Sequence, residues 1–349
     1  MAKSSNRKTA SAKKTRPAKA PPFFVQAVGM TDVGLVREGN EDALLIQPDE
    51  GLFVVADGMG GHNCGEVASQ FAIEAMMAFF ASAEIEKKVR RAHKAAREQL
   101  PKSQRDVSHH ALRLRKAIES ANISVFRLSQ QHEALRDMGT TVVGCSIVGS
   151  RLYIGNVGDS RLYRLRGRKL TQLTEDHSLV NEYLKMNMLR PEDVETFPYK
   201  NVIVRAVGLH ERVGVDVTFT TLRPGDQILL CSDGLTDLVR DHELRAILLG
   251  ADDIEMAAQD LIDFAKDRGG HDNITVLLMR CAPPGEAGEP ATFLKLPQSA
   301  PEDAVPAAPP PPGPPPAGPA PTAPPPPGPP PAGPAPTAPP PPGPAPIKD

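Results

Sequence analysis

The stretch LFVVADGMGGHNCGEVASQFAIEAMMAFF, residues 52–80, joins two hydrophobic patterns through one acidic turn. Residues 52–56 are continuously apolar, as in a buried strand, and residues 66–80 place apolar side chains at helical spacing. Between them, Asp57 is followed by a Gly-rich segment that favours a turn. This stretch therefore predicts a buried strand that ends in an acidic turn, with a helix after it.

Strand-like segments lie on both sides of this stretch and end at turns that often contain Gly. They cover residues 24–28, 43–46, 140–148, 151–156, 161–165, 215–220, 227–231 and 274–279. Helical spacing recurs over residues 84–131, with a break at Pro101, and over residues 254–265. Because the strands follow one another through short turns and the helices are grouped apart, the pattern predicts an α+β fold with antiparallel sheets.

Proline divides the chain of 349 residues into a body and a tail. Thirty of the 38 prolines follow Cys281, so the body uses proline sparingly for a globular chain. The first 20 residues hold seven Lys and Arg and no acid. We therefore expect a disordered basic arm over residues 1–22, a folded domain over 23–281 and a disordered Pro-rich tail over 282–349.

The tail repeats the 15-residue unit APPPPGPPPAGPAPT from Ala308, and the unit begins again at Ala323 and Ala338. Such a segment favours extended polyproline II. It is either a spacer or a ligand for a Pro-recognising domain, and the absence of a clear flanking Arg or Lys anchor favours the spacer. For the basic arm, a solubilising terminus is the better interpretation, so binding to nucleic acid is the less favoured one.

Cysteine usage and hydrophobicity indicate the cellular compartment. The four cysteines, at positions 64, 145, 231 and 281, show no paired spacing, which argues against a disulfide framework or a zinc ribbon and for a reducing compartment. No apolar segment follows the basic start, as a secretion signal would require. Nowhere do 18 apolar residues run together. The sequence therefore predicts a cytoplasmic protein with no membrane span.

Acidic residues recur at the ends of the expected strands, where a buried charge needs a reason. They are Glu41 and Asp42 in NED, Asp57 in ADG, Asp159 in GDS, Asp233 in SDG and Asp272 in HDN. One such turn would be ordinary turn chemistry. The set is more typical of a site with oxygen ligands.

Carboxylate oxygens suit hard divalent cations such as Mg²⁺ or Mn²⁺, whereas His and Cys are too scattered here for a zinc site. Two such ions lower the pKa of a shared water and clamp the oxygens of a phosphoryl transfer. Arg37, four residues before Glu41, offers a planar guanidinium group for a phosphate. These residues indicate a two-metal hydrolase that acts on a phosphate ester.

At these residues the chain resembles the type 2C metal-dependent protein serine/threonine phosphatases (PPM family), in particular their bacterial branch. The motifs that carry the resemblance are TDVGLVREGNED (31–42), ADGMGGHNCGEVAS (56–69), MGTT (138–141), GDSRLY (158–163), TEDHSLV (174–180), LCSDGL (230–235) and DNITV (272–276). The resemblance implies a four-layer α-β-β-α sandwich of two antiparallel sheets flanked by helices. It also implies hydrolysis of phosphoserine and phosphothreonine in proteins that are substrates of Ser/Thr kinases.

The resemblance further implies roles for the acidic residues. Asp57 would bridge two Mn²⁺ or Mg²⁺ ions, and Gly58 would offer its carbonyl oxygen to one of them. Asp233 and Asp272 would complete the shell of the first ion. Glu41 would hold the second, partly through water.

Three more residues match positions with known roles in the family. Asp42 resembles the supporting carboxylate, Asp159 the ligand of a weaker third ion, and Arg37 the arginine that binds phosphate. No phosphorylated enzyme intermediate is expected, because an activated water would attack phosphorus directly.

The group that protonates the leaving oxygen has several candidates. The eukaryotic branch carries a histidine in this role where this chain has Met59. Here the candidates are His62, His177 at the start of a flap expected over residues 177–211, and a metal-bound water. For either histidine the alternative is an ordinary hydrogen-bonding role in a loop.

Two surface features also bear on partners. The expected helix after residue 84 carries six cations that either recruit an acidic partner or form a solvated face, the second being the default. They are Lys87, Lys88, Arg90, Arg91, Lys94 and Arg97. Apolar flap residues either contact substrate or pack the flap down. They are Met186, Met188, Leu189, Phe197 and Tyr199.

The sequence thus favours an active phosphatase, expected to be a monomer. The alternative is a catalytically weak phosphoprotein-binding or scaffold module that acts through the Pro-rich tail. Every expected metal carboxylate is retained, which argues against this alternative, because a degenerate member would be expected to have lost one.

Overall fold

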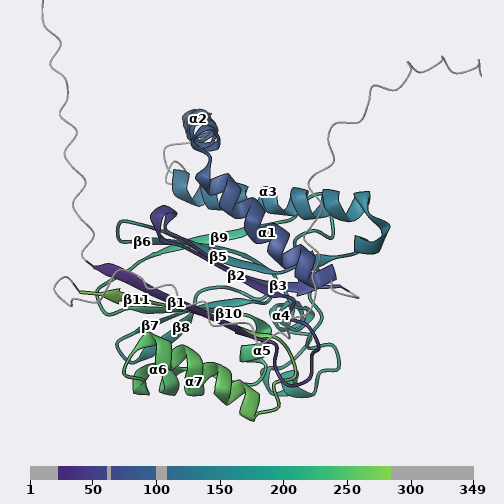
Figure 1. The fold of residues 1–349 in the computed structure, drawn as a ribbon, viewed down its shortest axis with the longest axis vertical. Helices are drawn as coiled ribbons and strands as arrows, with labels where there is room; N and C mark the ends of the chain where they lie inside the picture. Colours follow the sequence, from purple (N-terminus) through teal and green to yellow (C-terminus); the bar gives the residue numbers. More distant parts are fainter. Residues whose placement is uncertain (1–22, 61–63, 100–107, 284–349) are drawn as a thin grey trace, which may run out of the picture. The chain divides into compact units, whose positions relative to one another are not determined.

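The computed structural model describes residues 23–60, 64–99 and 108–283. His62, Pro101, the basic arm and the Pro-rich tail from residue 284, with its repeat, lie outside these residues. The domain boundaries at residues 22 and 282 therefore remain predictions. Within the described residues, two antiparallel sheets lie face to face with helices on both outer sides (Figure 1). The expected four-layer α-β-β-α sandwich is thus confirmed.

The first sheet pairs the two ends of the domain. Its strands, in spatial order, are β1 (Phe24–Asp32), β11 (Ile274–Ala282), β10 (Gln227–Cys231), β7 (Arg161–Arg166) and β8 (Lys169–Gln172). The register of β1 with β11 runs from Phe24 opposite Ala282 to Asp32 opposite Ile274. The start of β11, which follows Asp272, is thereby held beside the end of β1.

The second sheet contains the strand and acidic turn of residues 52–60. Its strands, in spatial order, are β2 (Asp42–Gln47), β3 (Leu52–Met59), β5 (Val142–Val148), β6 (Arg151–Val157) and β9 (Asp216–Thr221). The strand expected at 140–148 is divided, because β4 (Gly139–Thr140) pairs with the end of β3 and Thr141 separates it from β5. The break places Thr141 beside Asp57, to which its N–H donates at the carbonyl oxygen.

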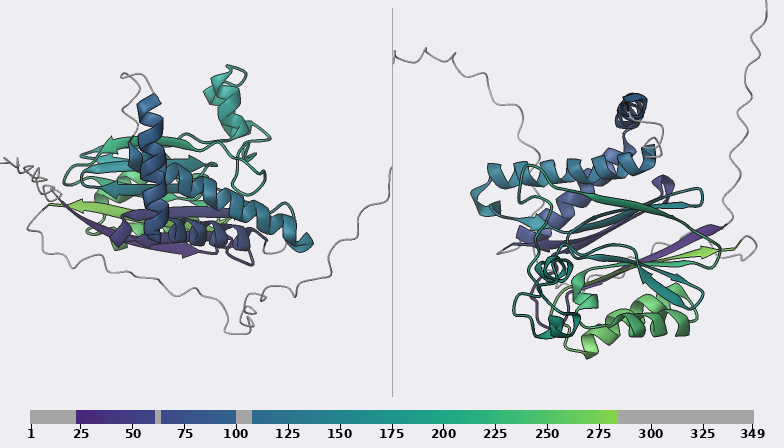
Figure 2. Two further views of the ribbon diagram at one scale, coloured as in Figure 1. Left: turned by 90° about the horizontal axis from the view of Figure 1, so that it is seen from above. Right: turned by 180° about the vertical axis from the view of Figure 1, so that it is seen from behind.

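Helices cover the outer faces of both sheets (Figures 1 and 2). The second sheet carries α1 (Cys64–Ala81) and α3 (His109–Gln131), and the first carries α5 (Asp233–Thr236), α6 (Asp241–Gly250) and α7 (Ile254–Asp267). Helix α2 (Ala83–Gln99) packs against α1 and α3 rather than on the sheet. The segment between β8 and β9 holds α4 (Leu179–Lys185) and the 3-10 helix η4 (Pro191–Thr196), and two further 3-10 turns are η1 (Pro48–Glu50) and η3 (Glu133–Leu135). No described helix is long and apolar enough to cross a membrane.

Three buried hydrophobic clusters fill the spaces between the layers. One lies between the two sheets and includes Val55, Leu230 and Leu277. The others lie under α1 and α3 on one side and under α6 and α7 on the other. The middle cluster holds the two sheets together, and both sheets contribute residues to the acidic cluster at their ends.

Replacing Leu230 by Ala should destabilise the domain without touching the acidic residues. Leu230 is 0% exposed in the middle cluster, and large-to-small changes at such positions cost about 2–5 kcal/mol. Urea unfolding followed by circular dichroism measures this cost. Met256→Ala, at a position in α7 that is 47% exposed, is the control and should change the free energy of unfolding by less than about 0.5 kcal/mol. Equal effects of the two changes would contradict the assignment of this core.

Candidate metal centre

The acidic strand ends meet at one end of the sandwich. In the second sheet, Asp42 at the start of β2 stands opposite Asp57 near the end of β3. In the first sheet, Asp233 follows β10 and Asp272 precedes the neighbouring strand β11. The sandwich brings the acidic residues of the two sheets together. Their proximity is evident at Asp57, whose pKa is raised by the charges of Asp42, Asp233 and Asp159.

Burial and mutual repulsion dominate the electrostatics of this cluster. Asp42 and Asp159 are 9% and 8% exposed, and burial together with neighbouring carboxylates raises the pKa of each to about 8. The same causes raise the pKa values of Asp57 and Asp233. Oδ1 of Asp42 and Oδ1 of Asp159 are buried without a hydrogen-bond partner. Because such oxygens are costly unless a proton or a cation satisfies them, the cluster fits divalent cations.

The acidic side chains are not arranged around a common point that an ion could occupy. In the described part of the chain, no three of them converge closely enough to hold a metal. Asp57 is instead hydrogen-bonded to Asp233, and Asp272 Oδ2 accepts a hydrogen bond from Arg37 Nη2 at 2.7 Å. Arg37 is 48% exposed on its side chain, so this pair is free to separate.

Two glycines let the backbone close around the cluster. A Cβ on Gly58 would lie 2.1 Å from the carbonyl oxygen of Gly65 and 2.5 Å from that of Glu41. A Cβ on Gly65 would lie 2.8 Å from Oε1 of Glu41. The end of β3, the first turn of α1 and the loop before β2 are therefore in direct contact. The Glu41 carboxylate consequently lies at the N-terminal turn of α1, where backbone N–H groups favour negative charge.

Hydroxyl groups that the sequence analysis did not single out hold the carboxylates in place. Ser232 Oγ donates to Asp42 Oδ2 at 2.7 Å and accepts from the Thr275 N–H at 3.0 Å. Thr141 Oγ1 accepts from the Asp57 N–H at 3.0 Å. Each hydroxyl thus connects an acidic residue of one strand to a second strand. In the sequence, only their position marks Ser232 and Thr141, since both lie inside the quoted motifs.

Asn273 was also missed, although it follows Asp272 directly. Its Oδ1 accepts from the Glu41 N–H at 2.8 Å, and its Nδ2 donates to the carbonyl oxygens of Val33 and Gly39 at 3.0 and 2.9 Å. One amide side chain therefore ties the loop between β1 and β2 to the start of β11. This loop carries both Arg37 and Glu41.

His177 is buried, with 2% of its surface exposed, and both ring nitrogens have partners. The Gly158 N–H donates to Nδ1 at 3.0 Å, so the ring proton lies on Nε2, which donates to Asp216 Oδ2 at 3.1 Å. Arg205 donates to Asp216 Oδ1 at 3.0 Å, and burial lowers the pKa of His177. These contacts match the hydrogen-bonding alternative better than a free proton donor. The other candidate, His62, is outside the described residues.

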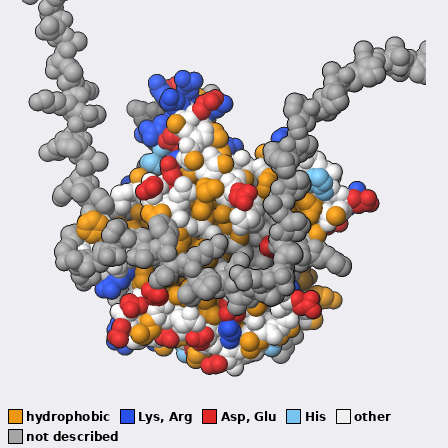
Figure 3. All heavy atoms as spheres, viewed as in Figure 1, with side chains coloured by type: hydrophobic (Ala, Val, Ile, Leu, Met, Phe, Trp, Pro, Cys, Tyr) orange, Lys and Arg blue, Asp and Glu red, His pale blue; other side chains and the backbone are white. Residues whose placement is uncertain are grey.

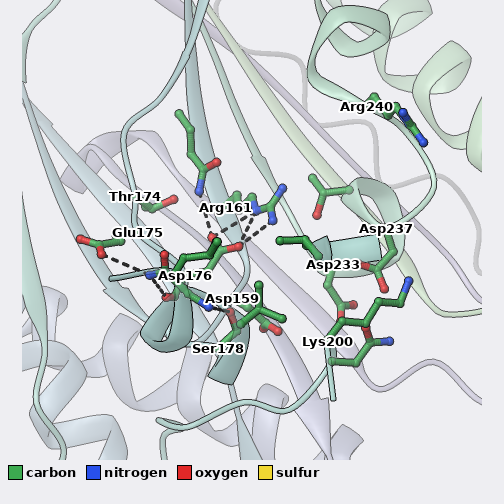
Figure 4. Close-up of a pocket in the computed structure, with 17 residues that line it drawn as sticks. Asp159, Arg161, Thr174, Glu175, Asp176, Ser178, Lys200, Asp233, Asp237 and Arg240 are labelled. Atoms are coloured by element: carbon green, nitrogen blue, oxygen red, sulfur yellow. Dashed lines mark hydrogen bonds and ion pairs between the residues drawn. The ribbon is translucent and has the colours of Figure 1, made fainter. Parts of the chain in front are cut away.

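A cavity of about 800 Å³ opens beside Asp159 and Asp233 (Figure 4). Part of its wall is the segment between β8 and β9, which contributes Leu184 and Lys200, and Asp237 lines it beside Lys200 (Figure 4). The apolar flap residues expected to meet substrate do not line it. Instead, the Phe197 ring lies against Tyr183 and Tyr199, while Met186 and Met188 are exposed. Of the acidic cluster, Asp159 and Asp233 line this cavity, so it opens directly onto one side of the cluster.

Comparisons with known proteins agree with this geometry. Residues 36–269 match the family model described as protein phosphatase 2C. The chain is 36% identical over 259 residues to the serine/threonine phosphatase stp of Listeria monocytogenes, covering 71% of this chain and 93% of that protein. It is 34% identical over 253 residues to the protein phosphatase PhpP of Streptococcus pneumoniae, covering 72% and 95%.

Solved structures show the same fold. The serine/threonine phosphatase PstP/Ppp of Mycobacterium tuberculosis superposes with a TM-score of 0.64 at 31% identity, covering 74% of this chain and 100% of that chain. The catalytic domain of the serine/threonine protein phosphatase PstP in complex with two manganese ions superposes with a TM-score of 0.61, also at 31% identity, covering 74% and 99%.

Replacing Ser232 by Ala should weaken Mn²⁺ binding about 10- to 100-fold, as expected when a group that orients a ligand is lost. The change removes the hydrogen bond to Asp42 and leaves the Thr275 N–H without its acceptor. Isothermal titration with Mn²⁺ measures the affinity. Ser129→Ala removes a buried hydroxyl of α3 that, among the described residues, bonds to the Phe126 carbonyl oxygen alone, and it should leave the affinity unchanged. An unchanged affinity in Ser232→Ala would contradict the role of this hydroxyl.

In chelator, the domain should lose stability as the pH rises from 6.5 to 8.5. Asp42 and Asp159 have a folded pKa of about 8, against an ordinary value of 3.8, so the folded state keeps protons that the unfolded chain releases. The free energy of unfolding therefore falls as the pH rises through the folded pKa values. Saturating Mn²⁺ favours the charged carboxylates and should flatten this dependence. Thermal melts at each pH measure it, and a melting temperature that rises over this interval in chelator would contradict the prediction.

Proposed function

This chain belongs to the protein phosphatase 2C family, and we propose that it hydrolyses phosphoserine and phosphothreonine in proteins, with Mn²⁺ or Mg²⁺ as cofactor. The observation that carries the proposal is the cluster of buried, mutually repelling carboxylates, two of which, Asp159 and Asp233, line a cavity of about 800 Å³. Its substrates are phosphoproteins made by Ser/Thr kinases, which it opposes.

Asp57 is central to the proposed metal set, because three other carboxylates act on its charge. We assign two ions to Asp57 with the Gly58 carbonyl oxygen, Asp233, Asp272 and Glu41. Asp42 supports Asp57 from the adjacent strand, and Asp159 is assigned to a weaker third ion. When bound, such ions lower the pKa of a water molecule and neutralise charge on the phosphate oxygens.

Arg37 binds the phosphate group of the substrate in this proposal. Its guanidinium group is exposed, ends beside Asp272 and stands on the loop that Asn273 anchors. Asp272 would hold a metal ion in this assignment, and the guanidinium group would then be available to donate to the phosphate oxygens, where it stabilises charge in the transition state.

His177 is proposed here as a positioning residue. Its Nδ1 fixes the Gly158 N–H and its backbone N–H donates to the Gly158 carbonyl oxygen at 2.9 Å, so it holds the turn that carries Asp159. His62 and a metal-bound water then remain the candidates for protonating the leaving oxygen.

Partners and location beyond the substrates are proposals that rest on composition. A reducing compartment such as the cytoplasm agrees with the four free, buried cysteines, and a monomer is the expected state. The Pro-rich tail serves as a spacer, with a Pro-recognising partner as the alternative, and nucleic acid is not expected to bind the basic arm. A scaffold without catalysis is not favoured, because every expected carboxylate is retained.

Replacing Asp57 by Asn should abolish Mn²⁺-dependent hydrolysis, and replacing Arg37 by Ala should lower kcat/KM about 10²- to 10³-fold. The first change removes the central metal ligand, and the second removes the donor to the phosphate. Hydrolysis of a phosphothreonine peptide and of p-nitrophenyl phosphate, with Mn²⁺ or with chelator, measures both. Arg127→Ala, an exposed arginine of α3, is the control and should be as active as the parent. Full activity of Asp57→Asn would refute the proposed function.

Replacing His177 by Gln should lower kcat and the affinity for a third ion while leaving the shape of the pH–rate profile unchanged. A positioning residue affects geometry, whereas loss of a general acid would remove the alkaline limb of the profile. Asp216→Asn, which alters the partner of the ring, should reproduce the smaller kcat. The pH dependence of kcat between pH 6 and 9 distinguishes the roles, and loss of that limb in His177→Gln would assign His177 as the acid instead.

A further inference from the structure

Helix α2 presents a continuous basic face to solvent. It carries six Lys and Arg side chains within 17 residues, and all six are exposed. We define the basic face of α2 by these side chains, which are Lys87, Lys88, Arg90, Arg91, Lys94 and Arg97. Figure 3 shows them as a group of blue side chains at the tip of the domain. The rest of the described domain shows no comparable concentration of positive charge on that face.

The base of α2 is fixed, although the helix projects beyond α1 and α3 (Figures 1 and 2). Val89 is buried, and Glu86 forms ion pairs with Arg113 at 3.1 Å and with His109 at 2.8 Å on α3. Arg113 also bonds to the carbonyl oxygen of Phe80 at the end of α1 at 2.6 Å. The projecting helix is therefore held in a defined direction, and its basic face is presented at a defined place.

Much of the positive charge on this face has no ion-pair partner among the described residues. Lys88 pairs with Glu84, and Arg90 pairs with Glu86. Lys87, Arg91, Lys94 and Arg97 form no ion pair with any described residue. Positions 87, 91 and 94 are spaced by four and three residues, so their side chains lie along one line of the helix.

We propose that the basic face of α2 binds an acidic segment of the phosphoprotein substrates, at a distance from the metal centre. The proposal rests on the function proposed above, since a protein phosphatase meets its substrates as proteins. A row of unpaired cations complements carboxylates spaced along an extended chain. The helix has no Phe, Tyr or Trp on which bases could stack, and the ring of its one histidine, His93, lies against His109. An acidic protein segment therefore fits it better than a nucleic acid.

The geometry sets the length of the substrate segment. Helix α1 begins beside Gly58 at the metal centre, has 18 residues and ends where α2 starts. At 1.5 Å per residue the two sites are separated by about 27 Å. An extended chain spans this distance in about eight to ten residues. Binding at α2 should thus lower KM for proteins with an acidic segment at this spacing and leave small substrates unaffected.

The test compares two full-length variants with the same change in charge. Lys87→Glu, Arg91→Glu and Lys94→Glu together reverse the basic face, whereas Arg168→Glu, Lys169→Glu and Arg223→Glu reverse exposed cations near the first sheet. The parent and both variants are assayed on two phosphothreonine peptides. One peptide carries six Asp residues placed ten residues away on either side of the phosphothreonine, and the other lacks them. We expect the acidic segment to lower KM about tenfold for the parent and the control, and to have no effect on KM for the α2 variant. All three proteins should hydrolyse p-nitrophenyl phosphate alike.

A binding measurement separates this proposal from the proposed function. A fluorescent peptide with six Asp residues and no phosphothreonine should bind the parent at low salt, lose affinity at 0.5 M NaCl and fail to bind the α2 variant. This result is independent of catalysis, so it holds even if the chain hydrolyses nothing. Equal KM values for the two peptides with the parent would overturn the proposal. So would tighter binding of an RNA oligonucleotide or of phosphatidylserine vesicles than of the acidic peptide.

Discussion

Repulsion between carboxylates is the constraint on which the rest of this structure depends. Asp42 and Asp57 stand opposite each other on neighbouring strands, a placement that destabilises a sheet when both are charged. Asp159 and Asp233 add to the repulsion from the other side. In the absence of ions, protons relieve it, as the raised pKa values show. The domain gives up stability here for a site whose preferred occupant is a divalent cation.

Opposing this repulsion requires contacts on every side of the cluster. The hydrophobic layer between the sheets brings strands from both sheets to one place, and Ser232, Thr141 and Asn273 tie their ends together. The glycine at position 58 removes the side chain that would separate β3 from α1. The small polar residues within the motifs are thus as necessary to the site as the acids, because they hold in place groups that would otherwise move apart.

The sequence predicted the layers well because their patterns are local. Strands such as β3 and β10 are continuous apolar runs, and α7 has a regular apolar stripe. It missed β8 and α6, whose short segments lack a strong period, and it joined β4 to β5 across Thr141. The acidic residues could be predicted from composition at strand ends. The partners of His177 could not, because Asp216 and Arg205 approach it from positions far along the chain.

The position of the metal centre has a consequence for selectivity. In the proposed mechanism, a cluster that binds a phosphate group through ions and Arg37 would treat phosphoserine and phosphothreonine alike wherever they occur, so it would contribute little discrimination between proteins. Selectivity must then arise where the chain contacts the rest of the substrate. The segment between β8 and β9 lines the cavity, and α2 stands about one helix length away at the other end of α1. The segment between β8 and β9 must keep His177, which holds the turn that carries Asp159. Because α2 takes no part in holding the carboxylates together, it can change in sequence without disturbing the chemistry, which is the property that a recognition surface requires.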